Sequence, residues 1–179
     1  MDSIKLTSEM IDGCTSNKPS RWLVVDTALQ MLFLVRESTI MAQWPVSTSE
    51  QGLDNRENSG GTPPGVHRIA EKIGLGAEIG TIFESREPTG EIWLPEWNND
   101  PERLQKDLIL TRILVLEGME PGLNLGSGID SRQRFIYVHG TNRIDLIGQP
   151  AGGGCVRMEN NNLIELFQQI EEGDFLVIV

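Results

Sequence analysis

The sequence predicts a mostly β domain, either a sandwich or a partly closed barrel, with one main helix near the C-terminus. Short β-branched and aliphatic runs recur along the chain and are separated by turn residues, while 19 glycines and 9 prolines are scattered throughout. Only one segment, close to the C-terminus, has apolar residues at convincing helical spacing. Because 179 residues suit one core of ordinary domain size, we expect a polar N-terminal leader over residues 1–20 and one domain over residues 21–179.

The first half of that domain is expected to be a β-meander followed by a long loop. Strand-like runs cover residues 22–26, 29–36, 40–47, 66–73 and 79–84. The segment 48–65 between the third and fourth runs is polar, rich in glycine and closed by Pro63-Pro64-Gly65. A loop of this length in a compact domain suggests a functional role.

The second half is expected to leave the sheet and return to it. Residues 86–107 contain three prolines, and Asp100-Pro101-Glu102 resembles the start of one short helix. Residues 108–116 and 134–138 are predicted strands. Asn162, with Glu165 three residues later, is predicted to cap the main helix, and the last residues, 175–179, form a strand. The predicted buried face of the helix consists of Leu163, Leu166, Phe167 and Ile170.

Composition and charge exclude several classes of function. The net charge of −11 opposes binding to nucleic acid or to an anionic membrane. No run approaches the ~20 apolar residues of a membrane-spanning helix. The first ten residues lack the apolar region of a secretory signal, so we expect a cytoplasmic protein, or a periplasmic one if an export signal has been removed. The two cysteines, Cys14 and Cys155, show no zinc-site spacing.

Cys155 is the first candidate for chemistry. It follows three glycines and precedes the predicted helix, so backbone N–H groups and the helix dipole are expected to favour its thiolate, with Arg157 adding a positive charge. The glycines Gly153 and Gly154 allow backbone amides to converge as an oxyanion hole. His139, 16 residues earlier at the end of a predicted strand, is a candidate base. Taken singly, a lone cysteine is more often buried and inert, and a lone histidine is more often structural.

The joint pattern is more specific, because it resembles a known family. Three segments together are similar to the signature of the L,D-transpeptidase catalytic domain, which has the YkuD-like fold: His139-Gly140-Thr141-Asn142, Gly148-Gln149-Pro150 and Gly154-Cys155-Val156-Arg157-Met158. Two earlier segments, Val46-Ser47-Thr48 and Thr62-Pro63-Pro64-Gly65, also resemble family segments. The resemblance covers residues 22–179 and implies a YkuD-like β-sandwich or barrel.

The resemblance also implies a reaction and roles for residues. Cys155 is expected to attack the L,D bond of a peptidoglycan stem tetrapeptide, between diaminopimelate or a similar residue and a terminal D-alanine, and to release the D-alanine. His139 would be the base, held by a backbone carbonyl near Gly140, and the amides of Gly154 and Cys155 would bind the oxyanion. No metal or other cofactor is implied. Expected substrate contacts come from Tyr137, Gly140, Thr141, Arg157 and His67, although a structural role for His67 is the stronger alternative.

One departure from the family pattern concerns the cysteine loop. The family usually has Ser/Thr-His-Gly-Cys, whereas Gly152 and Gly153 occupy the first two of these positions here. The missing hydroxyl and imidazole are expected to affect substrate positioning and turnover, while the mapped base is retained.

Several functions stay open at this point. Water as the acyl acceptor gives an L,D-carboxypeptidase that acts on free muropeptides during peptidoglycan recycling. A second stem or a D-amino acid as acceptor gives an L,D-transpeptidase that forms 3–3 cross-links or exchanges D-amino acids. A non-catalytic module that binds peptidoglycan peptides is the third reading. Carbapenems, which acylate many family members, are candidate inhibitors. Trp93 and Trp97, in the proline-rich segment, are either core residues or the lining of a substrate cleft.

Overall fold

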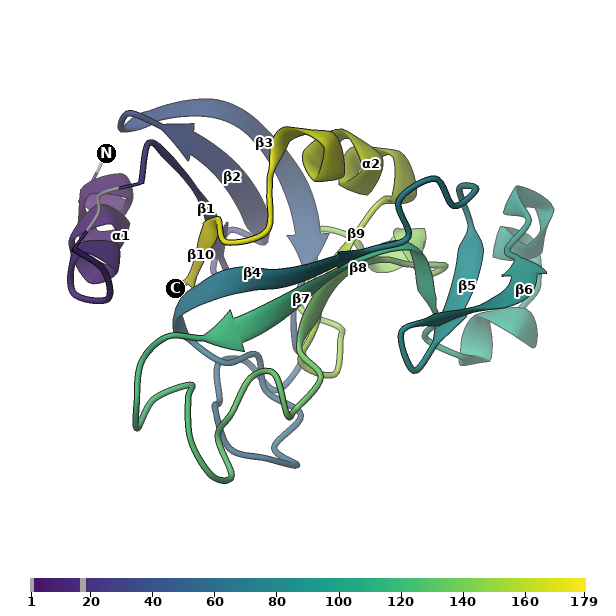
Figure 1. Cartoon of the computed structure of the whole chain (residues 1–179). Coiled ribbons are helices and arrows are strands. Elements are labelled where there is room, and N and C mark those ends of the chain that lie inside the picture. Colours follow the sequence, from purple (N-terminus) through teal and green to yellow (C-terminus); the bar gives the residue numbers. More distant parts are fainter. Residues whose placement is uncertain (1, 17–18) are drawn as a thin grey trace.

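The computed structural model describes residues 2–16 and 19–179 and is mostly β, which confirms the predicted fold class (Figure 1). Eight strands follow one another in the order β4-β10-β1-β2-β3-β9-β8-β7, and β4 also pairs with β7, so the sheet closes into a barrel. A hairpin of two further strands extends from β7. The strands are β1 (Arg21–Asp26), β2 (Met31–Arg36), β3 (Thr39–Ser47), β4 (Gly65–Ile73), β5 (Thr81–Glu84), β6 (Glu87–Ile92), β7 (Ile109–Gly118), β8 (Tyr137–Gly140), β9 (Val156–Met158) and β10 (Phe175–Ile178).

The main core lies inside the barrel and is covered by helix α2 (Asn160–Gln169). Alternate residues of each strand point inward, for example Leu23 and Val25 of β1, and the helix adds the apolar face predicted from its spacing. Each fully buried aliphatic side chain contributes roughly 1.5–3 kcal/mol through removal of apolar surface from water. The helical residues that join this core are Leu163, Leu166, Phe167 and Ile170.

The segment expected to be a polar N-terminal leader contains a helix that packs on the barrel. Helix α1 (Asp2–Asp12) packs against β10 and β4, and its fully buried Ile11 joins an outer apolar cluster with Trp22 and Val24. Thr7 accepts a hydrogen bond from Trp22 Nε1 at 3.3 Å. The buried positions 7 and 11 are four residues apart and share one helix face, but this signal is short and half polar, so the sequence pattern did not reveal it.

Two corrections near the C-terminus change the argument about Cys155. The predicted strand 134–138 lies further along, as β8, and the three-residue strand β9 follows Cys155 directly. Helix α2 starts at residue 160, beyond this strand, and it is capped by the carboxylate of Glu159, which accepts from the amides of Asn161 and Asn162, rather than by Asn162. The helix dipole consequently does not act on the thiol in the way the sequence suggested.

The excursion from the sheet is more regular than predicted. It contains strand β6 and two short 3₁₀ helices, η1 (Pro95–Asn99) and η2 (Arg103–Gln105), where one helix was expected. The Asp100 carboxylate does accept from the amide of Glu102 at 3.0 Å, as a helix cap would. A third 3₁₀ helix, η3 (Ile144–Leu146), lies between β8 and the cysteine loop.

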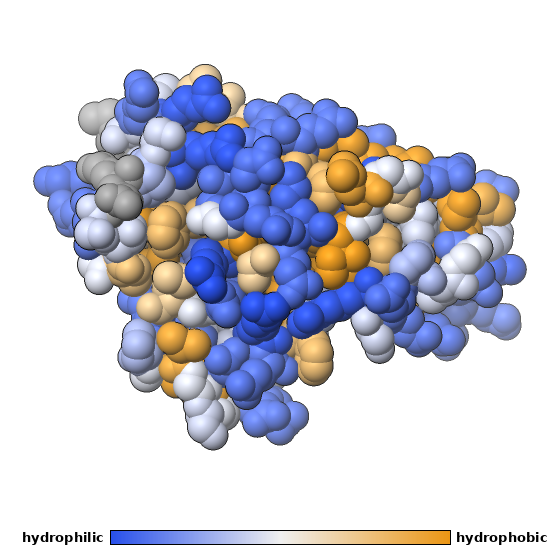
Figure 2. Space-filling model, in the orientation of Figure 1, coloured by the Kyte–Doolittle hydropathy of each residue, from blue (hydrophilic) through white to orange (hydrophobic). Residues whose placement is uncertain are grey.

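Two long loops meet below β4 and β7 in Figure 1, namely residues 48–64 and 119–135. They are joined by hydrogen bonds, including Glu57 N–H to Gly128 O at 2.7 Å and Asn124 Nδ2 to Pro64 O at 3.0 Å. The face shown in Figure 2 is largely hydrophilic, with apolar residues in scattered groups. Within the described ranges, no helix has the length and apolar character needed to cross a membrane.

Candidate active site

Cys155 and His139 lie on one face of two neighbouring parallel strands. Strand β8 pairs with β9 in the register Val138–Val156, and both of these valines point into the barrel. Because side chains alternate along a strand, His139 and Tyr137 on β8, and Cys155 and Arg157 on either side of Val156, all face outward. An outer cluster of Phe83, Ile113, Val115 and Tyr137 packs against Cys155 on this face. The fold thus brings together the two residues that the sequence singled out.

His139 is held in the orientation that a general base requires. Its Nδ1 bonds to the carbonyl oxygen of Gly140 at 2.8 Å, so Nδ1 carries the proton and Nε2 keeps its lone pair. No other described residue bonds to the ring. Burial lowers the pKa of His139, partly offset by the hydrogen bond to Gly140 and by Asp107. The imidazole is therefore neutral near pH 7 and ready to accept a proton at Nε2.

The Cys155 thiol is protonated at rest. Burial raises its pKa to about 11, and the hydrogen bond from Tyr137 N–H, 3.3 Å from Sγ, lowers it only in part. The thiol donates to the carbonyl oxygen of Phe135 at 3.4 Å. Asp107 raises the pKa and Arg157 lowers it by a smaller amount. A raised pKa is in contrast to the stabilised thiolate expected from the sequence.

The loop that carries the cysteine is fixed to the segment after β3. Gly148 N–H donates to Val46 O at 2.8 Å, and the amides of Ala151 and Gly152 both donate to Thr48 O. Gly154 has φ +120°, and a side chain there would approach the carbonyl of Gly61 to 3.2 Å, so this position requires glycine. The amides of Gly153, Gly154 and Cys155 have no acceptor among the described residues, which leaves the expected pair, Gly154 and Cys155, available for an oxyanion.

The two glycines that depart from the family pattern differ in their surroundings. A Cβ added at Gly153 would meet nothing within 4 Å, whereas one at Gly152 would lie 3.2 Å from Thr48 O and 3.3 Å from Arg157 Nε. A side chain at Gly153, where the family usually has histidine, would therefore start in open space. Gly152 instead sits against the guanidinium of a buried arginine.

Arg157 joins the strands around the cysteine. Its side chain, only 2% exposed, bonds through Nη1 to Asp107 at 3.0 Å and through Nη2 to Ser47 Oγ at 2.7 Å. Ser47 in turn donates to the carbonyl oxygen of Gln149 in the cysteine loop at 2.6 Å. Arg157 Nε is the one buried side-chain N or O atom of the described residues that lacks a partner. These contacts assign Arg157 a positioning role, and they leave little of it for direct contact with a substrate.

Thr141 and Gly140 lie behind the base rather than beside the thiol. Thr141 is fully buried, and its carbonyl accepts from Asn160 Nδ2 at 3.0 Å. A Cβ at Gly140 would come within 2.3 Å of Asn160 Oδ1 and 2.6 Å of Leu110 O, so the close packing of β8 on β7 requires glycine. Asn160 also accepts from Thr111 Oγ1 at 2.6 Å. Through these contacts the start of α2 is tied to the end of the strand that carries His139.

The long loop 48–65 forms one wall of the site. Arg134 donates to two of its carbonyls, those of Asp54 at 3.1 Å and Gly61 at 2.7 Å, and Gly61 lies against Gly154. Within the loop, Ser49 Oγ donates to Gly60 O at 2.6 Å and Thr62 Oγ1 accepts from Ser49 N–H at 3.0 Å. The loop is therefore held in place by hydrogen bonds beside the segment that carries Cys155.

His67 does not share the surface of Cys155 and His139. It is fully buried, its Nδ1 bonds to Gly65 O at 3.1 Å and its Nε2 bonds to Ser131 Oγ at 2.8 Å. Burial lowers its pKa to about 4. With both ring nitrogens occupied and no exposed surface, His67 has no means of contacting a substrate in this conformation.

Tyr137 contributes its backbone and ring rather than an exposed hydroxyl. The side chain is buried, and its hydroxyl accepts a hydrogen bond from Arg86 Nε at 2.9 Å, while its amide reaches Cys155 Sγ. Sequence reasoning missed four residues that contact the catalytic candidates or the residues that support them, namely Arg86, Phe135, Asp107 and Asn160. They come from turns and segment ends whose pairing with β8 and β9 has no local signal in the sequence.

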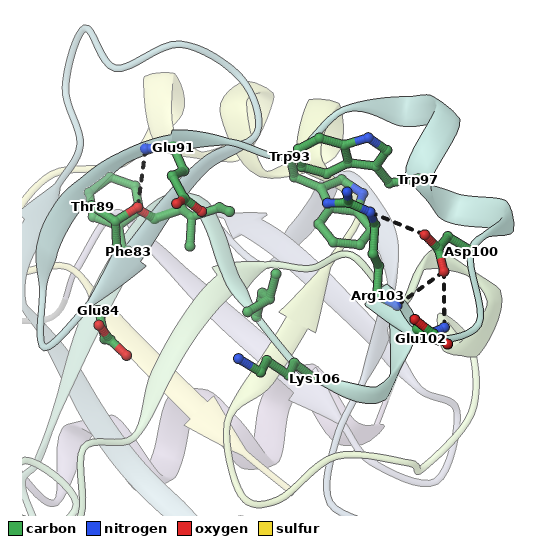
Figure 3. A pocket seen from close by; sticks show the side chains of 12 residues that line it. Phe83, Glu84, Thr89, Glu91, Trp93, Trp97, Asp100, Glu102, Arg103 and Lys106 are labelled. Carbon is green, nitrogen blue, oxygen red and sulfur yellow. Dashed lines mark hydrogen bonds and ion pairs between the residues drawn. The ribbon is translucent and has the colours of Figure 1, made fainter.

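A cavity of about 640 Å³ opens near the site without reaching the two catalytic candidates. Trp93 and Trp97 line it, together with Phe83, which also belongs to the cluster around Cys155. The two indoles meet edge to face at 5.4 Å, and Figure 3 shows the Arg103 guanidinium, 4.1 Å from the ring centroid of Trp97, bonded to Asp100. Trp93 is buried and both tryptophans line the cavity, while a role in binding a substrate stays a prediction. Within the described ranges, no group of three His, Cys, Asp or Glu side chains is placed to hold a metal.

Comparisons with known proteins show which family this chain matches. The family model described as "L,D-transpeptidase catalytic domain" matches residues 20–179. A protein from Bacillus subtilis (strain 168), named "Putative L,D-transpeptidase YqjB", is 36% identical over 69 residues, which are 35% of this chain and 39% of that protein.

Two solved structures are similar in fold. An L,D-transpeptidase from Xylanimonas cellulosilytica DSM 15894 aligns with TM-score 0.55 and 15% identity, over 97% of this chain and 69% of that one. LD transpeptidase LdtMt1 in complex with imipenem aligns with TM-score 0.52 and 16% identity, over 89% of this chain and 59% of that one. The chain thus spans about two fifths to two thirds of the length of these relatives.

Proposed function

Because the chain belongs to the L,D-transpeptidase catalytic domain family, we propose that it is a cysteine acyltransferase that cleaves the L,D bond of peptidoglycan stem tetrapeptides and releases the terminal D-alanine. The observation that carries this proposal is the position of Cys155 and His139 on one face of the β8–β9 pair, with Nδ1 of the histidine bound to a backbone carbonyl. The fixed tautomer supplies a base whose lone pair is on Nε2.

The chemical steps follow from these groups. His139 Nε2 removes the proton of Cys155 Sγ as sulfur attacks the carbonyl carbon of the L,D amide. The amides of Gly154 and Cys155 receive the oxyanion of the tetrahedral intermediate. The imidazolium then protonates the departing D-alanine nitrogen, the C–N bond breaks and a thioester on Cys155 remains. An acceptor deprotonated by the same histidine attacks the thioester, and the proton returns to sulfur.

Water is the acceptor that we propose first, which makes the protein an L,D-carboxypeptidase of peptidoglycan recycling. Gly153 is exposed, and a Cβ there would meet nothing within 4 Å, so solvent has access to the cysteine loop. The cytoplasmic location expected from the sequence would fit hydrolysis of free tetrapeptides, and it stays a prediction.

Transfer to an amine is the second candidate, and the names of the relatives favour it, since each is called an L,D-transpeptidase. The product would be a 3–3 cross-link or a stem with an exchanged D-amino acid. The relative that holds imipenem supports the further proposal that carbapenems acylate Cys155.

The test is to incubate the purified protein with a muropeptide tetrapeptide, with and without an added D-amino acid, and to identify the products by mass spectrometry. Release of D-alanine to give tripeptide supports the carboxypeptidase, and dimers or exchanged tetrapeptides support the transpeptidase. The Cys155→Ala variant must abolish either product, and Cys14→Ala, which removes the other thiol, must retain it. Absence of any Cys155-dependent product would overturn the enzyme proposal in favour of a peptide-binding module.

A further inference from the structure

A buried threonine lies in a bulge of β7, next to the strand that carries the candidate base. Thr111 is fully buried and has φ +71°. With the residue after it, it has no partner in the pairing of β7 with β8, opposite the step from His139 to Gly140. The bulge accounts for the backbone angle, which glycine would adopt without steric cost. It does not account for a β-branched residue at this position, so the reason for the threonine lies in its side chain.

The hydroxyl of Thr111 makes two hydrogen bonds that run in one direction. Its Oγ1 accepts from the amide of Gly80, directly before β5, at 3.0 Å, and it donates to Oδ1 of Asn160, the first residue of α2, at 2.6 Å. Because a backbone N–H can only donate, the hydroxyl proton is left for Asn160. The threonine therefore fixes which way the asparagine amide points, with Oδ1 towards the hydroxyl and Nδ2 away from it.

Asn160 holds the segment that directly follows the base. Its Nδ2 donates to the carbonyl oxygen of Thr141 at 3.0 Å. Strand β8 ends at Gly140, so the pairing of strands no longer holds the backbone beyond that residue. The carbonyl of Gly140, one residue before that of Thr141, is the group that bonds to Nδ1 of His139 at 2.8 Å. The asparagine thus anchors the carbonyl next to the one that orients the ring.

The glycine at position 140 makes such an anchor necessary. A side chain there would collide with Asn160 Oδ1 and with the carbonyl of Leu110, so only glycine fits. Glycine restricts its own backbone angles less than any other residue. The peptide that joins Gly140 to Thr141 could therefore rotate and turn its carbonyl away from His139. The hydrogen bond from Asn160 to the following carbonyl opposes this rotation.

We propose that Asn160, oriented by Thr111, is a positioning residue for His139. By holding the carbonyl of Thr141 it keeps the carbonyl of Gly140 directed at Nδ1, so that the neutral ring has its proton there and its lone pair on Nε2. Without this anchor, the proton is expected to exchange between the two ring nitrogens, and the fraction of the imidazole that can act as a base falls. The inference rests on the proposed function, because a fixed tautomer has a catalytic use only if His139 is the base.

The test reads the tautomers of both histidines by nuclear magnetic resonance of protein labelled with ¹⁵N in the imidazole rings, without substrate, at about pH 8 where both rings are neutral. The wild type should show His139 protonated at Nδ1 alone. Asn160→Asp keeps the acceptor for Thr111 and loses the donor to Thr141, and Thr111→Val loses the hydroxyl. Both variants should show a second population protonated at Nε2. An unchanged signal of His67 shows that each variant is folded.

Two matched variants separate the hydrogen bonds from other effects of substitution. Asn162→Asp makes the same change two residues further along α2, where no hydrogen bond links the side chain to β8 among the described residues, and it should keep the wild-type tautomer and kcat. Thr111→Ser keeps the hydroxyl and should restore most of what Thr111→Val loses. In tetrapeptide cleavage, Asn160→Asp and Thr111→Val should lower kcat about tenfold, with KM within about twofold, as one lost hydrogen bond predicts.

Three results would overturn the inference. They are a wild-type His139 protonated at Nε2, a spectrum of His139 that stays unchanged in both Asn160→Asp and Thr111→Val, and an equal second population in Asn162→Asp, which would assign the effect to the added charge. None of these results depends on turnover. If the wild type forms no product that depends on Cys155, the proposed function fails, and the spectra still decide whether Asn160 orients the ring.

Discussion

The two histidines of this chain are both buried, but only one of them has a hydrogen-bond partner on Nε2. His67 bonds through Nδ1 to Gly65 O and through Nε2 to Ser131 Oγ, whereas His139 bonds only through Nδ1, to Gly140 O. Burial lowers the pKa of both. The comparison shows that a backbone carbonyl on Nδ1 orients the imidazole in either region. Only His139 keeps its Nε2 without a hydrogen-bond partner among the described residues, which is what the proposed base requires.

The surroundings of His67 are more completely hydrogen-bonded than those of His139. Around His67, β4 is paired on both sides and the loop from Pro121 onward closes over it. Around His139, the neighbouring outward side chains are the partly exposed Cys155 and the network of Arg157. Both ring nitrogens of His67 have hydrogen-bond partners. Around His139, in contrast, Nε2 of the histidine and Nε of Arg157 have none among the described residues.

The largest expected difference between the two regions is in catalysis. His139→Gln should lower kcat/KM for tetrapeptide cleavage by ~10²- to 10⁴-fold, because it removes the general base. His67→Gln should leave kcat/KM of the folded protein within about threefold, since it touches no reacting atom, while lost hydrogen bonds reduce its stability by about 1–3 kcal/mol. Steady-state kinetics with thermal unfolding of both variants checks this, and equal losses of activity would contradict the assignment.

The next difference concerns the thiol. With a pKa of about 11, Cys155 should have a thiolate fraction about 10²-fold below that of an unperturbed thiol near neutral pH. Its alkylation by iodoacetamide in a Cys14→Ala background should therefore accelerate continuously as pH rises towards 11. A rate that is already maximal near pH 6 would indicate a preformed thiolate–imidazolium pair and would contradict the protonated resting state.

Acid stability should report on His67. The unfolded chain binds a proton below pH 6.5, but folded His67 does so only near pH 4. The free energy of unfolding should therefore fall as pH decreases from 6.5 to 4, by about 3 kcal/mol from this residue, and then level off. Denaturant unfolding of wild type and His67→Gln across this range measures the effect. The variant should lose this part of the pH dependence, while His139, shifted in the same direction, keeps its own part.

A substitution at Phe135 tests whether its unfavourable backbone conformation is retained at a cost in stability. Phe135→Gly relieves a backbone conformation with positive φ, so the free energy of unfolding should stay the same or rise by up to about 1 kcal/mol. Turnover of the tetrapeptide should fall several-fold, because a glycine holds the carbonyl that accepts from Cys155 Sγ less firmly. A marked loss of stability in the denaturant midpoint would show that the ring packs structurally, despite its exposure.

The smallest expected effect is at the cysteine loop. Gly153→His enters open space, so the rate of acylation should change by less than about threefold, as for a surface substitution. The ratio of hydrolysis to amine transfer should fall modestly, because the new side chain restricts the approach of water. Product ratios by mass spectrometry measure this, with Gly153→Ala as the control for size. An unchanged ratio would remove the argument that the glycines favour water.

The elements that could be predicted from the sequence are those with a long periodic pattern of apolar residues. The apolar face of α2 and the strand runs of β1 to β4 are periodic over many residues, and the structure has them where the sequence predicted. Strand β9 is three residues long, too short for any periodicity, and its absence from the prediction led to the wrong argument that a helix dipole activates Cys155. Helix α1 was missed because few apolar residues mark its buried face.

Sequence motifs identified the catalytic candidates, but they did not identify the residues that hold these candidates in place. Arg157 was recognised beside the cysteine, but its partners, Asp107 and Ser47, lie 50 and 110 residues away in the chain. The positive φ of Arg86 arises in the two-residue turn that joins β5 to β6. A single sequence contains no local trace of such pairings, so this part of the site required the structure.

The most direct test of the account is to trap the acyl-enzyme. The wild type, His139→Gln and His67→Gln are mixed with the diaminopimelate tetrapeptide, quenched in acid at short times and measured as intact proteins and as peptides by mass spectrometry. We predict a tripeptide thioester on Cys155 that forms at similar rates in wild type and His67→Gln and at least ~10²-fold more slowly in His139→Gln. An adduct on another residue, or equal acylation rates in all three proteins, would contradict the assignment of Cys155 and His139 as nucleophile and base.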